Sequence, residues 1–289
     1  MTIERRLRSE GQTSLKSSIT IEGTALHAGV PVSLTMAPAE AGAGYVFVRR
    51  DLNDAEIIGS PETVVETRLG TCIANDAGAT VKTIEHLLAA FYIAGVDNAR
   101  ITLTGPEPPI LDGSAAGFLS FIDQAGLFHS DIPKRRITPS APIEVRDGDR
   151  FVRFEPSAER RLTVSIDFPD PAIGVDQVTI DLCDAATTRD RLASARTFCR
   201  RADIEAMRAS GLARGGSLEN AVVVDGETIL NEGGLRDHQE FALHKALDLV
   251  GDLALLGGVL EGAVIAHKPG HDLNTGLAKK IFAENKAAG

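Results

Sequence analysis

This chain has few cysteines and no cysteine motif. Cys72, Cys183 and Cys199 are its three cysteines, and none belongs to a CxxC pair. An odd number without paired spacing argues against a disulfide scaffold and is typical of a protein kept in a reducing compartment. Structural zinc sites usually use four ligands with cysteines among them, so this class is not indicated. The HExxH motif of zinc metalloproteases is also absent.

The chain also lacks a segment typical of membrane insertion or export. Its longest apolar stretch, LALLGGVLEGAVIA, is interrupted by glycines and by Glu261. That stretch is too short and too polar to span a bilayer. The N-terminal MTIERRLRSEG has no apolar core of a signal peptide. We therefore expect a cytoplasmic protein without stable membrane insertion.

Basic residues are not in excess, since the formal net charge is −10. This charge argues against binding of nucleic acid or of an anionic membrane by the surface as a whole, although a local basic pocket remains compatible with it. Apolar residues make up 43% and charged residues 24%, which is ordinary for a globular protein with a real core. A length of 289 residues suggests two domains.

The predicted elements occur in the same order twice. In the first half, strands in 17–38 and 44–51 are followed by a helix, a strand and a helix, which are expected at 80–95, 98–105 and 114–126. In the second half, strands are expected at 142–156 and 160–169. A short helix follows at 202–211, a strand at 221–230, a long helix at 240–257, a strand at 261–270 and a last helix at 272–286. Gly95 and Gly126 should end the first two helices, and Ser114 should cap the second.

We therefore predict a duplicated α+β architecture with helices on one face of each sheet. Residues 129–142 contain three prolines, a basic cluster and no apolar period, which indicates a domain boundary. We therefore predict a first domain at 1–132 and a second domain at 133–289. The first fifteen residues are charged and aperiodic, so we expect a frayed lead-in.

The helix expected at 240–257 carries an unusual polar stripe. His244, Asp248 and Asp252 follow each other at intervals of four residues, which places them within roughly 80° of arc on one face. Two aspartates at this spacing repel each other and are poor helix formers. Phe241 and Leu255 lie on the same stripe, so this face need not meet open water.

Two more stretches bring polar groups into apolar surroundings. Glu85 and His86 are adjacent in TIEHLLAA, and Lys268 and His271 stand in AHKPGHDLN, on a Gly-Pro loop after a strand. Each residue alone has an ordinary explanation, such as a solvated loop or a helix N-terminus that favours a carboxylate. The three stretches together weaken that explanation.

An imidazole and a carboxylate four residues apart on one helix face, as at His244 and Asp248, are close enough to chelate a metal. One further histidine from another helix completes a His₂Asp set. Three N/O ligands with one open position are the arrangement of a catalytic zinc site, which would hold a water with a pKa near 7.

Six ordered blocks are distributed along most of the chain, TIEHLLAA, PPILDGSAAGF, ARTF, GGS, LNEGGLRDHQEFALHKALDLVGDL and KPGHDLN. In these blocks the sequence resembles a known family, the UDP-3-O-acyl-N-acetylglucosamine deacetylases, zinc enzymes of the committed step of lipid A synthesis. The resemblance extends over nearly the whole chain. It implies two similar α+β sandwich domains with the active site between them, a Zn²⁺ cofactor and an acylated UDP-amino sugar as the small-molecule substrate. The sequence does not set the oligomeric state, and a monomer is expected.

The resemblance also implies roles for the residues of these blocks. His86, His244 and Asp248 match the zinc ligands, and Glu85 matches the general base. The water would be activated by the metal and by this carboxylate.

Four further residues match groups that handle charge and protons. His271 matches the catalytic loop histidine, Asp252 the carboxylate that supports it, and Thr197 the threonine that binds the oxyanion. Lys245 matches the lysine of the family's HK pair. Whether Glu85 alone or Glu85 with His271 moves the protons stays open.

The remaining matches concern the substrate. Phe168, after Asp167, matches the aromatic residue against which uracil stacks, and Lys268 one that lies by the nucleotide phosphates. An insert around 197–224 is expected to form the acyl passage, with Phe198 and Ile204 in its wall.

The chain departs from the family pattern in two places. Ala25 stands where glycine is common before His27, which either lines the site or is structural. Arg200 and Arg201 follow ARTFC where apolar residues are usual. Their stems can line the passage, or they point away while Phe198, Ile204 and Met207 form its wall; we favour the second arrangement.

Two other functions compete with the main prediction. One is a zinc deacetylase acting on a different small amide. The other is a nucleotide-sugar-binding protein without catalysis, which would not require the full set of ligands together with Glu85 and His271. Metal content together with acetate release would distinguish these three functions.

Overall fold

Two five-stranded sheets with the same strand order form the frame of the molecule. The structure, a computed structural model, describes residues 11–287. The first sheet has the order β2-β3-β9-β4-β5, with bounds Ile19–Thr24, Pro31–Ala37, Ala99–Leu103, Tyr45–Arg49 and Ala55–Gly59. The second has the order β12-β13-β20-β14-β15, with bounds Ile143–Asp147, Arg150–Glu155, Ala263–His267, Arg161–Asp167 and Val175–Asp181.

In both sheets the last strand along the chain lies in the middle. β9 is antiparallel to β3 and parallel to β4, and β20 is antiparallel to β13 and parallel to β14. The buried faces follow the period of two expected for strands, as in β14, where Leu162, Val164 and Ile166 point inward. The prediction of a duplicated α+β fold with two similar sandwich domains is therefore confirmed. The division at 132/133 stays a prediction.

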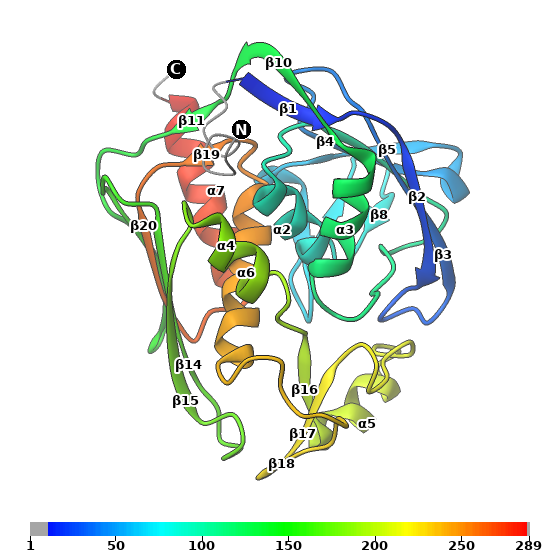
Figure 1. The fold of residues 1–289 in the computed structure, drawn as a ribbon, viewed down its shortest axis with the longest axis vertical. Helices are drawn as coiled ribbons and strands as arrows, with labels where there is room; N and C mark the ends of the chain where they lie inside the picture. The colour runs from blue at the N-terminus through cyan, green and yellow to red at the C-terminus, as the bar shows by residue number, and fades with distance from the viewer. Residues whose placement is uncertain (1–10, 288–289) are drawn as a thin grey trace.

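The main helices lie between the two sheets, as Figure 1 shows. Their bounds are Glu85–Ala94 for α2, Ala116–Ala125 for α3, Glu240–Ala254 for α6 and His271–Ala287 for α7. α2 of the first half packs along α6 of the second half. A Cβ on Gly251 of α6 would lie 2.0 Å from the carbonyl oxygen of Glu85. The absence of a side chain at Gly251 therefore allows the backbones of α2 and α6 to approach closely.

Replacing Gly251 by alanine is expected to force these two helices apart. The added methyl group has no room, so the free energy of unfolding should fall by about 3 kcal/mol, the upper end of the usual cost of overpacking. Urea unfolding followed by circular dichroism measures the change. Gly276→Ala in α7 is the matched control, because its Cβ would lie 3.3 Å from the nearest atom of Val145. Equal midpoints for Gly251→Ala and the wild type would contradict the prediction.

Smaller elements complete the fold. β1 (Gly11–Leu15) pairs with β10 (Leu127–Pro133), and β11 (Arg136–Ile137) pairs with β19 (Val259–Leu260). The remaining short strands are β6 to β8, at Val64–Glu66, Cys72–Ala74 and Thr80–Val81, and β16 to β18, at Phe198–Arg200, Val222–Asp225 and Thr228–Ile229. The short α-helices are α4 (Ala185–Thr187) and α5 (Arg201–Ala209), and further short helical segments lie at Arg50–Leu52, Pro61–Thr63 and Thr188–Leu192. Strands β16 to β18 and α5 lie together at one end of the molecule (Figure 1).

Some predicted elements differ from the structure. Residues 11–15 of the expected frayed lead-in form β1, while residues 1–10 lie outside the described part. The segment expected to be irregular begins inside strand β10. The helix expected at 80–95 begins only at Glu85, because Thr83 has a left-handed backbone (φ 55°) that cannot continue a helix. Ser114 lies one residue before the N-cap, although its hydroxyl accepts from the Ala116 amide.

Candidate active site

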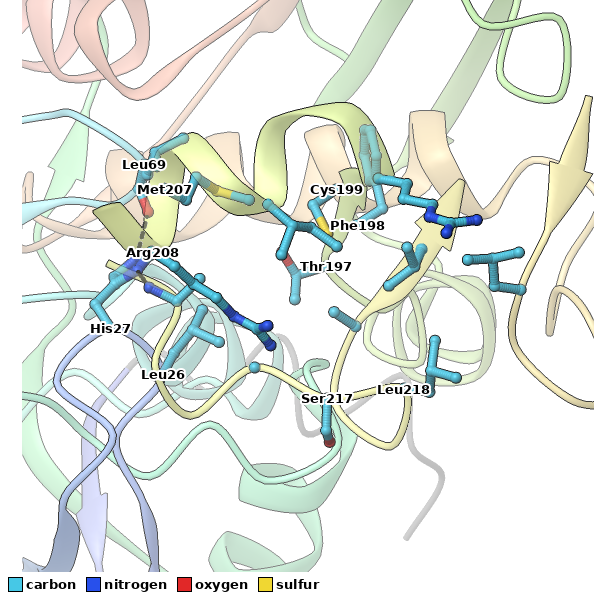
Figure 2. Close-up of a pocket in the computed structure, with 17 residues that line it drawn as sticks. Leu26, His27, Leu69, Thr197, Phe198, Cys199, Met207, Arg208, Ser217 and Leu218 are labelled. Atoms are coloured by element: carbon cyan, nitrogen blue, oxygen red, sulfur yellow. Dashed lines mark hydrogen bonds between the residues drawn. The ribbon is translucent and has the colours of Figure 1, made fainter. Parts of the chain in front are cut away.

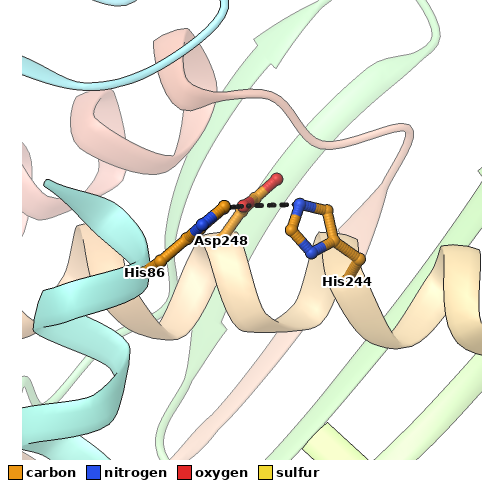
Figure 3. A group of neighbouring side chains, drawn as sticks. All are labelled: His86, His244 and Asp248. Carbon is orange, nitrogen blue, oxygen red and sulfur yellow. Dashed lines mark ion pairs between the residues drawn. The ribbon is translucent and has the colours of Figure 1, made fainter. Parts of the chain in front are cut away.

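Three buried side chains from the two facing helices converge on one point (Figure 3). His86 comes from the first turn of α2, and His244 and Asp248 come from α6. Asp248 Oδ1 lies 3.6 Å from His86 Nε2 and 3.4 Å from His244 Nε2. Ligand atoms of a tetrahedral site with bonds of 2.0–2.1 Å are about 3.3–3.4 Å apart. The two distances from Asp248 Oδ1 are close to this spacing and all three ligand atoms lie within 4.8 Å of one another, so the set fits a metal ion such as zinc.

The polar atoms around this point are prepared for a cation. Within residues 11–287, Asp248 Oδ1 is buried without a hydrogen-bond partner, which is uncommon for a carboxylate oxygen. The other oxygen, Oδ2, accepts from Lys245 Nζ at 2.8 Å. Burial disfavours the charged form of Asp248, but the polar groups around it, the Lys245 ammonium at 2.8 Å among them, outweigh it and hold the pKa of this carboxyl well below its usual value. The free oxygen is therefore an anionic ligand.

His244 is held in the form that a metal ligand requires. Its Nδ1 lies 3.1 Å from the carbonyl oxygen of Ala195, to which it can only donate, so the lone pair is on Nε2. Burial lowers the pKa of His244 to about 3, which keeps the ring neutral. The residues present thus fit a bound metal.

Glu85 stands beside this ligand set with one oxygen anchored. Its Oε2 accepts from the amide of Thr71 at 2.9 Å, and its side chain is almost fully buried. Burial raises the pKa of the Glu85 carboxyl above its usual value, and the nearby His271 opposes part of that rise. A carboxylate with a raised pKa is a better proton acceptor than an exposed one.

His271 lies on the other side of Glu85, with Nε2 3.9 Å from Glu85 Oε1. It is the first residue of α7 and not a loop residue as predicted. Its Nδ1 donates to Asp252 Oδ2 at 2.9 Å. Burial disfavours the imidazolium, but Asp252 and Glu85 outweigh this and raise the pKa of His271 to about 10. The ring is therefore a charged proton donor at neutral pH.

Three polar residues of this site were missed from the sequence. The hydroxyl of Thr71 and the amide of Asn274 both donate to Asp252. Asn274 could have been found, because it follows His271 by three residues, which is a helical spacing. Thr71 gives no such signal, because it lies in an irregular segment. Thr83 lines a cavity together with Glu85 and His271, and its buried hydroxyl has no hydrogen-bond partner among the described residues.

A cavity of about 260 Å³ is lined by His86, His244, Asp248, Glu85 and His271, and it reaches Thr197 and Phe198. Thr197 is fixed by backbone bonds to Gly113 and Val222 at 2.8 Å each. The ring of Phe198 packs edge-on against Phe168, with centroids 5.4 Å apart. Thr197 and Glu85 thus line the same cavity as His86, His244 and Asp248, and the roles expected for these residues stay predictions.

A second, largely apolar cavity of about 320 Å³ is drawn in Figure 2. Leu26, Leu69, Thr197 and Phe198 line both cavities. Its other walls come from His27 and from the segment 198–230, including the side chains of Ile204 and Met207 on α5. The insert around 197–224 therefore builds most of this cavity.

The two arginines of the insert differ in position. Arg200 bonds to Asp170 and is not among the lining residues. Arg201 pairs with Asp225 at 2.7 Å and also lines the cavity.

The residues predicted to meet the nucleotide lie apart from both cavities. Lys268 Nζ is 2.8 Å from a carboxylate oxygen of Asp149 and 2.8 Å from one of Asp167. Neither Lys268, Asp167 nor Phe168 lines either cavity in the part of the chain that the structure describes. Their roles stay predictions.

A duplicated α+β fold that places a His₂Asp set beside a buried carboxylate and a carboxylate-paired histidine defines a metal-dependent hydrolase. The chain belongs to the UDP-3-O-acyl N-acetylglycosamine deacetylase family, whose model matches residues 12–283. It is 45% identical over 281 residues to the UDP-3-O-acyl-N-acetylglucosamine deacetylase of Anaeromyxobacter dehalogenans, covering 97% of this chain and 90% of the relative. The deacetylase of Phenylobacterium zucineum is 44% identical, covering 96% and 94%. That of Campylobacter jejuni (strain RM1221) is 40% identical, covering 96% and 93%.

Among the described residues, no helix combines the length and apolar character needed to cross a membrane.

Proposed function

We propose that this protein is a cytoplasmic, zinc-dependent amidase that removes the N-acetyl group of UDP-3-O-(3-hydroxyacyl)-N-acetylglucosamine and releases acetate, the committed step of lipid A synthesis. The observation that carries the proposal is the unpartnered, buried Asp248 Oδ1 facing His86 and His244, directly beside Glu85 and His271. Family membership supports the substrate. His86, His244 and Asp248 are the residues that would hold the zinc ion.

A bound zinc ion supplies a Lewis acid and lowers the pKa of a water molecule in its open position. Glu85 takes a proton from the attacking water through the oxygen that Thr71 does not occupy. The hydroxyl of Thr197 donates a hydrogen bond to the carbonyl oxygen of the acetyl group as negative charge develops there. His271 holds a proton on Nε2 and gives it to the amine as the C–N bond breaks. The products are acetate and the free amine.

Loss of one imidazole ligand is expected to remove the metal. His244→Ala leaves two ligands, so zinc content should fall from about one ion per chain to a small fraction of it. Metal analysis after dialysis measures this without relying on activity. The exposed His238, whose Nδ1 contacts Asp237 at 3.3 Å, gives the matched control His238→Ala, which should keep its zinc. Full zinc content in His244→Ala would overturn the assignment of this ligand.

The apolar cavity is expected to bind the acyl chain of the substrate. Each buried CH₂ contributes about 0.8 kcal/mol, so a chain of ten or more carbons can supply much of the affinity. Ile204→Asp places a charge in the cavity wall and should raise KM sharply for the acylated substrate. For UDP-N-acetylglucosamine, which has no acyl chain, KM should change little.

Arg200→Ala is the comparison variant in the same segment, because Arg200 bonds to Asp170 outside the cavity. We expect it to affect KM less than Ile204→Asp does. A larger loss in Arg200→Ala, equal with and without the acyl chain, would instead assign this arginine to the diphosphate.

A further inference from the structure

His27 connects the two cavities through both nitrogens of its ring. Its Nδ1 accepts from the amide of Ala213 at 3.2 Å, so the proton of the neutral ring is on Nε2. That nitrogen donates to the carbonyl oxygen of Leu69 at 2.9 Å, the bond drawn in Figure 2. His27 is 7% exposed. A single side chain thus spans from the insert to the segment that leads to Thr71.

Both backbone groups that His27 binds belong to residues with a left-handed backbone. φ is 59° at Leu69 and 52° at Ala213. Residues other than glycine rarely adopt this conformation, and it persists only where the surrounding structure imposes it. The ring of His27 supplies such a restraint to both residues at once.

The Leu69 side of this connection ends at the catalytic carboxylates. Leu69 lines both cavities and is followed by Gly70 and Thr71. The amide of Thr71 holds Glu85, and the hydroxyl of Thr71 holds Asp252. A shift of the Leu69 carbonyl would therefore be felt by the base and by the partner of His271.

The Ala213 side ends at the apolar cavity, which Ala213 lines together with Met207 of α5. The backbone of His27 is also held in place. The buried carboxylate of Glu107 accepts from the amides of His27 at 2.8 Å and Ala28 at 3.1 Å. The position of His27 is therefore restrained at its backbone and at both ring nitrogens, and none of these bonds goes to His86, His244, Asp248 or Glu85.

We infer that His27 is a positioning residue that transmits occupancy of the apolar cavity to Glu85 and Asp252. An acyl chain packed against the wall that includes Ala213 restrains the amide bonded to His27. The ring then restrains the Leu69 carbonyl, and Thr71 is held in the orientation that serves both carboxylates. This inference depends on the proposed function and adds one consequence to it: the acyl chain raises kcat as well as lowering KM.

The test compares kcat and KM for the acylated substrate and for UDP-N-acetylglucosamine. His27→Asn can keep an acceptor for Ala213 but is too short for Leu69, whereas His27→Gln can reach Leu69 but loses the acceptor at the Nδ1 position. Each variant should lower kcat on the acylated substrate by about 5- to 150-fold, the usual size of coupling between two sites. On UDP-N-acetylglucosamine the kcat of each variant should fall clearly less than on the acylated substrate, because no acyl chain is present there to add to the restraint on the ring.

His129 provides the matched control, since its Nδ1 bonds to Thr13 at 3.0 Å and it lines neither cavity. His129→Asn should change neither kcat. Thermal unfolding is measured for every variant, and the rates are compared at a temperature where each is folded.

Three results would overturn the inference. Equal kcat values of the wild type on the two substrates would show that the acyl chain of the substrate does not affect the catalytic step. An equal loss of kcat on both substrates would make His27 a general support of the base. A change in KM alone would make it only a wall of the cavity. If the zinc-loaded wild type releases acetate from neither substrate, the proposed function itself fails.

Discussion

Replacing Glu85 by glutamine is expected to lower kcat by about 10²–10⁴, the usual contribution of a general base, while zinc remains bound. Glutamine keeps the length and nearly the shape of the side chain, and its carbonyl oxygen can still accept from the Thr71 amide that now holds Oε2. What is lost is the second oxygen, which is free to accept a proton. Because Glu85 is not one of the three ligands, the metal set is unchanged.

The experiment measures acetate release under saturating substrate together with zinc content. Glu62→Gln is the matched control, since Glu62 is an exposed glutamate that pairs with Lys286 on the surface. It should retain wild-type kcat and zinc. A Glu85→Gln protein with full zinc and undiminished kcat would remove Glu85 from the proton transfer. Loss of zinc from this variant would show instead that Glu85 supports the metal.

The duplicated fold could be predicted because its signals are local. Alternating apolar residues mark strands such as β14, and glycines such as Gly95 mark helix ends. The helix α6 could also be assigned a site, because His244 and Asp248 at a spacing of four residues must share one face. In these cases short stretches of sequence contain the information that the structure uses.

The missed features depend on partners far away in the chain. β1 looked like a frayed end because its strand partner is β10, more than a hundred residues later. Thr71 has an ordinary sequence environment, yet it holds Asp252 from the opposite half of the molecule. Such contacts are determined by the packing of α2 against α6, which no local periodicity reports. The same reason kept the two bonds of His27 out of the sequence prediction.

The second large effect is expected for the pair formed by His271 and Asp252. His271→Ala removes the proton donor for the leaving amine, so kcat should fall by about 10²–10⁴. The variant Asp252→Asn keeps the donor but removes the negative charge that stabilises its charged form. These two changes have different consequences for the pH dependence of kcat/KM.

An acid must be protonated to act, so the step that needs His271 slows as the pH rises above the pKa of this group. In the wild type, burial disfavours the imidazolium, yet Asp252 and Glu85 raise the pKa of His271 to about 10. Without the charge of Asp252, the effect of burial is opposed less strongly, so the pKa of His271 falls. The alkaline limb of the profile should therefore begin at a pH lower by roughly 1–3 units in Asp252→Asn.

In His271→Ala that limb should be absent, because the group that titrates there is gone. Asp97→Asn is the matched control, because it makes the same substitution at an aspartate that pairs with Lys134 and lines neither cavity. This variant should leave the pH profile unchanged. An alkaline limb at the same pH in wild type and in Asp252→Asn would mean that another group sets it. His271 would then serve the oxyanion by its charge, and the proton for the amine would have to return from Glu85.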